Sequence, residues 1–124
     1  MLRSYRDLDV WKRSLALVSD TYRITRNLPS DERFGLTSQL RRAAVSVTVN
    51  LAEGYGRSTR GEYLNHLSFA RGSLFELEAL CTVCQTLSFL KSEDVQLLEE
   101  HIIRVRQMLR ALKSALQKKS AKPK

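Results

Sequence analysis

The stretch LPSDERFGLTSQLRRAAVSVTVNLAEGYGRSTRGEYLNHLSFARGSLFELE, Leu28 to Glu78, decides the fold of this chain. It consists of two amphipathic segments, one on each side of a Gly-rich turn, and each segment has small residues on its apolar face. Polar residues also recur along both segments at helical spacing. The pattern predicts a closely packed helical hairpin with a buried polar seam, and it contains no recognisable catalytic site.

The chain up to the middle of this stretch predicts two helices. In the first, from Leu8 to Leu28, apolar residues at three- and four-residue steps form two lines on roughly opposite faces. The lines are Leu8, Trp11, Leu15, Val18 and Tyr22 on one side, and Val10, Leu17, Ile24 and Leu28 on the other. Ser30 is the expected N-cap of the second helix, which runs to about Glu53. The segment Ala44–Leu51 alternates like a strand, but the helical line continues through it and no second strand is available for pairing, so we predict a helix.

Two further helices follow. Thr59 and Glu62 fit a capping box at the start of the third helix. From Gly72 to Leu90 this helix carries almost no charge, which predicts that it is buried by more than one bundle's core. Ser92 is expected to open the fourth helix, whose apolar seam runs unbroken from Val95 to Leu116.

Four helices joined by short connections predict an all-α, antiparallel up-down-up-down four-helix bundle. We assign residues 1–116 to the bundle and residues 117–124, which are Lys-rich and lack large apolar side chains, to a disordered tail. The first two helices have a second apolar face that a single bundle does not cover. We therefore expect the chain to form a homo-oligomer.

The chain is basic, with 21 Lys and Arg against 13 Asp and Glu and a net charge of +8. This excess favours polyanionic partners, although a solvated basic face also serves solubility alone. No apolar stretch resembles a secretory signal or a membrane span, so a cytoplasmic protein without membrane contact is expected. Candidate contacts to RNA or DNA phosphates lie in the first and last helical regions: Arg3, Arg6, Lys12, Arg13, Arg104, Arg106, Arg110 and Lys113.

No motif for an enzyme, a metal or a cofactor is present. Cys81 and Cys84 form a C-x-x-C pair in mid-helix without a second ligand pair, which favours core packing over redox or zinc chemistry. The Gly54–Gly56 segment has neither the spacing nor the preceding strand of a phosphate loop, so we interpret it as a turn that ends the second helix. His66 and His101 lack matching carboxylates and are expected at the surface or at an edge.

A polar line on the second helix faces a shorter one on the third. Either the residues form a hydrogen-bonded seam that fixes helix register, or they line a ligand pocket. Buried polar groups require partners in any case, so we favour the structural role. The seam residues are Arg42, Ser46, Asn50 and Glu53 on the second helix, and Ser73 and Glu76 on the third.

Six segments together resemble one known family. They are D-L-x-V-W from Asp7, P-S-D-E-R-F-G-L from Pro29, Q-L-R-R-A-A-V-S-V from Gln39, N-L-A-E-G from Asn50, E-Y-L from Glu62 and A-R-G-S-L-F-E-L-E from Ala70. The chain resembles the four-helix-bundle proteins encoded within intervening sequences of bacterial large-subunit ribosomal RNA genes. That family is similar in fold to the accessory variability protein of diversity-generating retroelements, which is basic, binds nucleic acid and associates with a reverse transcriptase.

The resemblance implies a non-enzymatic protein that forms a ring, commonly a homopentamer. Together with the charge, it favours binding to RNA or DNA without strong sequence preference. One alternative is a scaffold for another protein, such as a reverse transcriptase. A second is a redox protein that uses Cys81 and Cys84.

Overall fold

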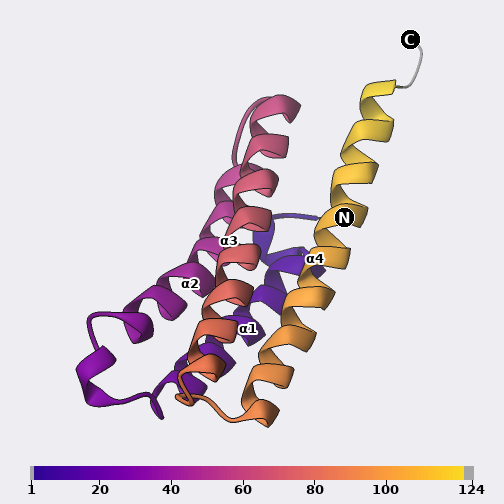
Figure 1. Cartoon of the computed structure of the whole chain (residues 1–124). Coiled ribbons are helices and arrows are strands. Elements are labelled where there is room, and N and C mark those ends of the chain that lie inside the picture. Colours follow the sequence, from indigo (N-terminus) through magenta and orange to yellow (C-terminus); the bar gives the residue numbers. More distant parts are fainter. Residues whose placement is uncertain (1, 122–124) are drawn as a thin grey trace.

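Four helices follow one another up, down, up and down in the computed structural model, which describes residues 2–121 and, of residues 119–121, only the backbone (Figure 1). They are α1 (Asp9–Thr25), α2 (Leu36–Tyr55), α3 (Arg60–Thr86) and α4 (Ser92–Ala121). Two short 3-10 helices, η1 (Tyr5–Asp7) and η2 (Ser30–Glu32), precede α1 and α2. Both α1 and α3 pack against α2 and α4, so the four helices surround a shared core. The predicted all-α four-helix bundle is confirmed.

The core is built from one line of each helix. On α1 it is the line of Leu17 and Ile24, which are fully buried, whereas Leu15 is 42% exposed. The Val-rich part of α2 is helical throughout, and its buried residues follow steps of three and four: Leu40, Ala43 or Ala44, Val47 and Leu51. The continuing helical line therefore outweighs local strand propensity, as the sequence predicts.

The start of the second helix differs from the prediction. Ser30 begins η2 instead, and α2 begins six residues later at Leu36. The cap comes from an acidic side chain in η2, because Glu32 Oε1 accepts a hydrogen bond from the Leu36 N–H at 3.2 Å. The intervening loop carries Phe34, which is 89% exposed. Glu32 thus caps α2 from across the loop, and the connection between Ser30 and α2 is longer than the sequence suggested.

The ends of the other helices follow local sequence signals in part. The Thr59 side chain accepts from the Glu62 N–H at 3.1 Å, as expected for the N-cap of α3. Helix α2 passes through Gly54 and ends at Tyr55. Helix α4 continues to Ala121, beyond the boundary expected at residue 116, and residues 122–124 of the predicted tail lie outside the described part. Within residues 2–121, no helix has the length and apolarity that a membrane crossing requires.

Candidate nucleic-acid interface

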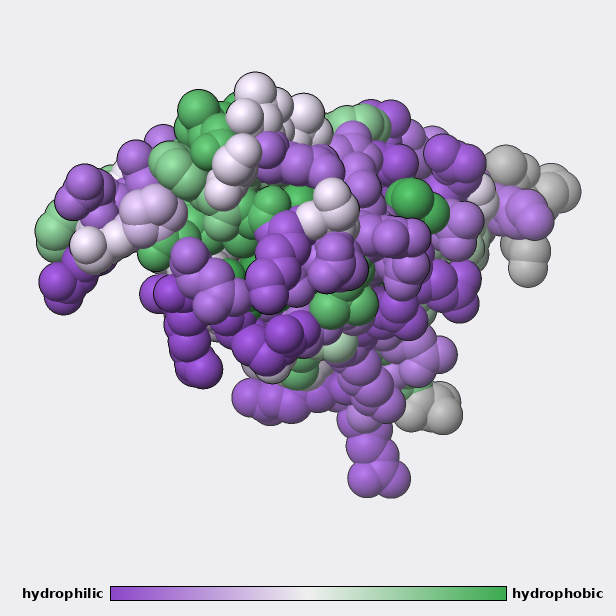
Figure 2. All heavy atoms as spheres, turned by 60° about the horizontal axis from the view of Figure 1, so that its bottom comes forward, coloured by the Kyte–Doolittle hydropathy of each residue, from purple (hydrophilic) through white to green (hydrophobic). Residues whose placement is uncertain are grey.

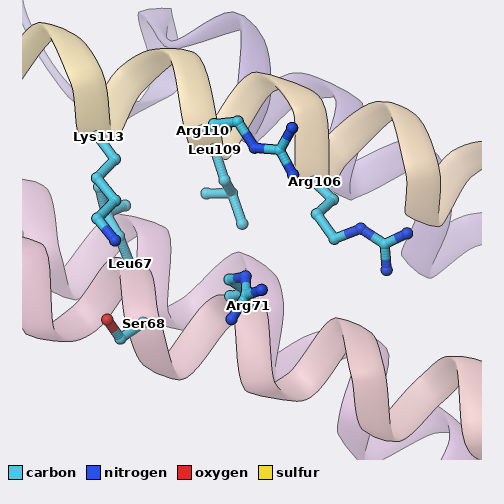
Figure 3. A pocket seen from close by; sticks show the side chains of 7 residues that line it. All are labelled: Leu67, Ser68, Arg71, Arg106, Leu109, Arg110 and Lys113. Atoms are coloured by element: carbon cyan, nitrogen blue, oxygen red, sulfur yellow. The ribbon is translucent and has the colours of Figure 1, made fainter.

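A basic groove lies between α3 and the C-terminal half of α4. Its cavity measures about 280 Å³, and the almost fully buried Leu67 and Leu109 supply apolar wall. Figure 3 shows Lys113 extending from α4 toward α3, and Arg71 rising from α3 toward Leu109. The cations that line the groove are Arg71 on α3 and Arg106, Arg110 and Lys113 on α4. The three on α4 are spaced by four and three residues, which places them on one face of that helix.

The Phe75 ring contacts two of the groove cations, although it does not itself line the groove. The guanidinium carbons of Arg71 and Arg106 lie 4.9 and 4.8 Å from the centroid of Phe75, within the range of cation–π attraction. Glu78 Oε2 lies 3.8 Å from Arg106 Nη1, close enough for an ion pair but too far for a hydrogen bond. The Arg106 Nη1 atom is buried and has no hydrogen-bond acceptor. Phe75 and Glu78 therefore hold the guanidinium in place while leaving one of its donors unused.

The predicted basic residues do not form one surface. Arg106, Arg110 and Lys113 share the groove, whereas Arg104 faces a separate shallow depression beside the start of α1. Arg71 was not predicted. Its spacing of four residues from Phe75 on one helix is a signal for an arginine–aromatic pair, and it could have identified this residue.

The predicted contacts near the N-terminus have other local partners. The Arg13 Nε–H donates to His101 Nδ1 at 3.3 Å, which turns this cation toward α4. The Arg6 guanidinium lies 5.1 Å from the centroid of the Tyr5 ring. Arg3 and Lys12 are exposed. None of these four residues lines the α3–α4 groove.

A polar ladder crosses the α2–α3 interface. The Ser46 and Ser73 hydroxyls are 2.8 Å apart, and the Asn50 amide donates to the Ser46 carbonyl at 2.9 Å and to its hydroxyl at 3.1 Å. The Asn50 Oδ1 atom is 3.0 Å from His66 Nδ1. Glu53 is half-exposed and lies 3.7 Å from the same nitrogen. Four of the predicted seam residues thus belong to one network. The network also includes His66, which was not predicted to be part of the seam.

Arg42 and Glu76 lie at the edge of this ladder. Both are exposed, and they line an open polar pocket of about 390 Å³ together with Ser46. Neither makes a side-chain hydrogen bond or an ion pair among the described residues. The structure therefore places them beside the seam rather than within it.

Both histidines take part in helix–helix contacts. His101 is buried, which corrects its expected position at the surface or at an edge, whereas His66 is half-buried. The Arg57 Nε–H donates to His66 Nε2 at 3.2 Å, so Nδ1 carries the proton and donates to Asn50. The Arg13 Nε–H likewise occupies His101 Nδ1, and His101 Nε2 donates to Asp20 Oδ2 at 2.7 Å. The sequence around each histidine does not predict these contacts, because the partner residues are up to 88 positions away in the chain.

The charge on Asp20 is stabilised by this contact. Partial burial raises the pKa of its carboxyl, but hydrogen bonds from His101 and Arg23 outweigh the burial and place the pKa below its ordinary value of 3.8. The contact therefore joins α1 to α4 through an ionised carboxylate.

The two cysteines pack in the core. Both are fully buried, as the sequence predicts, and burial raises the pKa of Cys81 to about 12 and raises that of Cys84. Such pKa values oppose thiolate formation, on which redox and metal-binding cysteines depend. In the part of the chain that the structure describes, no three His, Cys, Asp or Glu side chains gather in a way that would hold a metal ion.

A sequence model of the 23S rRNA-intervening sequence protein family matches residues 6–111. The chain belongs to this family. Its structure is similar to that of a protein of unknown function in the S23 ribosomal protein family from Bacteroides thetaiotaomicron, with a TM-score of 0.78 and 17% sequence identity. The alignment covers 85% of this chain and 95% of that protein, so the two share a fold over almost their whole length. A comparison with curated proteins gives no match.

Proposed function

We propose that this chain is a non-enzymatic, self-associating bundle that binds the phosphates of RNA or DNA with little sequence preference. The observation that carries the proposal is the α3–α4 groove, where four cations line a cavity and the nearest ion-paired carboxylate is Glu78. Lys and Arg side chains bind phosphates of any sequence and release counterions as they do so. Membership of a family named for intervening sequences of 23S rRNA agrees with a nucleic-acid partner.

Exposed apolar side chains support self-association. Figure 2 shows green apolar surface between hydrophilic residues on one side of the molecule. Leu15 and Tyr22 on α1 and Val49 on α2 are 39–44% exposed, and the Arg41 guanidinium of α2 lies 4.5 Å from the Tyr22 ring centroid. A face that spans two helices in this way suits a second copy of the chain. In our proposal the copies close into a ring, a pentamer, and the repeated grooves raise affinity through avidity.

Salt-dependent binding tests the nucleic-acid part of this proposal. The variant Arg110→Glu/Lys113→Glu changes two exposed groove cations, and Arg33→Glu/Lys91→Glu, with the same change in net charge, is its matched control away from the groove. We expect the groove variant to bind every sequence more weakly and to lose about 1.4–1.8 from the slope of log K against log salt, since each phosphate contact contributes about 0.7–0.9.

Three results would count against this proposal. An intact protein that ignores both nucleic acids at low salt refutes phosphate binding, and equal effects of the groove and control variants refute the assignment to the groove. A monomer mass from light scattering at micromolar concentration refutes the ring.

A protein-binding scaffold is the second candidate function. Phe34 favours it, because this ring is 89% exposed on the loop between η2 and α2 and is not required by the core. A reverse transcriptase is the partner that the family resemblance suggests. Retention of this partner by the Arg110→Glu/Lys113→Glu variant, together with its loss in Phe34→Ser, would support the scaffold.

A further inference from the structure

The α3–α4 groove has the shape of a pocket for a compact group. Its volume of about 280 Å³ lies just below the roughly 300–1,000 Å³ that small-ligand sites occupy, so it suits a compact group. Helices α3 and α4 form the two walls of the groove. A phosphate or a single nucleotide can therefore enter between them, whereas a double helix would contact only the outer edges of the groove. This geometry suits the end of a strand better than the middle of a duplex.

The charges converge on this space from both helices. Among the residues with described side chains, Arg106 is the groove cation that has a carboxylate within ion-pair distance, and Arg71, Arg110 and Lys113 have none. Arg71 and Arg106 also both contact the Phe75 ring, and both line the groove together with Arg110 and Lys113. Like charges placed close together repel, and an anion bound between them would relieve this repulsion.

An unsatisfied donor gives an independent indication of a ligand. Buried polar atoms in folded proteins are nearly always hydrogen-bonded. The Arg106 Nη1 atom is buried without an acceptor, and Glu78 is too distant to serve as one. Arg106 makes no side-chain hydrogen bond among the described residues, so its guanidinium keeps donors to which a small oxyanion in the groove could supply acceptor oxygens.

We propose that the α3–α4 groove binds the terminal phosphomonoester of a single nucleic-acid strand. A terminal phosphate carries about −1.5 to −2 charge at pH 7 and three acceptor oxygens, whereas an internal phosphodiester carries a single charge and two free oxygens. Cations that line one cavity from two helices suit the higher charge of the terminal group. Leu67 and Leu109 offer apolar contact to the sugar and base behind the phosphate.

This inference rests on the proposed function, and one set of titrations separates the two. The full chain is titrated with a single-stranded RNA that carries either a 5′-phosphate or a 5′-hydroxyl and a dye at its 3′ end. We expect about tenfold tighter binding of the phosphorylated strand. Arg71→Gln should remove most of this difference and weaken the 5′-hydroxyl strand only as much as the loss of one phosphate contact does. Lys91→Gln, which removes the same charge just before α4 begins, should preserve the difference.

Titration with adenosine 5′-monophosphate identifies the source of the phosphate. One outcome is strong binding of the free nucleotide that Arg71→Gln abolishes, with equal binding of the two strands. This outcome supports the phosphomonoester site and assigns it to free nucleotides. Salt-dependent but equal binding of both strands, with no nucleotide binding, overturns this inference and leaves the proposed function in place. Nucleotide binding without any strand binding refutes the proposed function and retains the site.

Discussion

Gly54 gives the sharpest test of how α2 and α3 pack. This residue is buried one position before the end of α2. A Cβ atom at this position would lie 2.9 Å from His66 Cβ and 3.0 Å from Tyr63 Cδ1, both on α3. The Cβ of His66 is fixed by its own backbone and cannot rotate away. Gly54→Ala therefore requires the two helices to separate, which also strains the hydrogen bond between Asn50 and His66.

The expected change in stability follows from two opposing effects. Alanine favours a helix over glycine by about 0.5–1 kcal/mol. Overpacking at a close contact costs about 1–3 kcal/mol. Gly54→Ala should therefore lower the free energy of unfolding by about 1 kcal/mol, within a range of about 0–2.5 kcal/mol, or by roughly 4–5 °C in Tm for a chain of this size. Gly72→Ala is the matched control, because this exposed residue of α3 has no neighbour within 4 Å of an added Cβ and should gain about 0.5–1 kcal/mol.

Urea denaturation followed by circular dichroism measures both changes. Protomer concentration is kept equal, since self-association would otherwise alter apparent stability. Opposite signs for the two alanine variants support the close approach at Gly54. A Gly54→Ala protein that is as stable as the Gly72→Ala protein would show that α2 and α3 are not in this contact.

Three further variants test the polar and thiol contacts. Asn50→Leu removes the acceptor for a buried histidine and should cost about 1–3 kcal/mol in urea denaturation; an unchanged midpoint would show that the ladder contributes nothing. Cys81→Ala/Cys84→Ala should lower stability by about 1–2 kcal/mol and keep nucleic-acid binding, and rapid labelling of both native thiols would contradict their burial. Because its folded-state pKa is lowered, Asp20 contributes stability above about pH 4 that is lost as the pH falls through that pKa. Asp20→Asn should therefore lower stability at neutral pH and flatten the acid loss in pH-dependent melts; an unchanged acid profile would exclude Asp20 as its source.

The periodic part of the sequence predicts the fold well. Apolar lines at helical spacing are long in all four helices, and the continuation of one line through the Val-rich segment of α2 resolves a local conflict between strand and helix. The cap at Thr59 is equally readable, because its partner lies three residues away. Features that are encoded within one turn of a helix are therefore accessible from sequence.

Contacts between helices are not accessible in the same way. The sequence predicts Gly54 to be a turn residue, yet it is helical with a negative φ. Its lack of a side chain lets α2 lie close to α3. The histidines read as isolated, yet each receives an arginine hydrogen bond and donates to an oxygen on another helix. These roles depend on rotation and distance between helices, which no local spacing specifies.

The candidate site was only half predictable for the same reason. Arg106, Arg110 and Lys113 share a helical face and could be grouped by spacing alone. Their relation to Arg71 depends on how α3 lies against α4, and the lack of an acceptor for Arg106 Nη1 depends on atomic positions.

The segment Ala70–Glu78 shows why a structural motif and a binding site need not be separate. Ser73 faces α2 and joins the polar ladder, while Leu74 and Leu77 fill the core. The residues on another side of the same two turns face α4: Arg71, Phe75 and Glu78. The ladder fixes the register of α3 against α2, and this register sets where Arg71 and Phe75 meet α4. On our proposal, the polar ladder therefore helps to position the groove in which the phosphate binds.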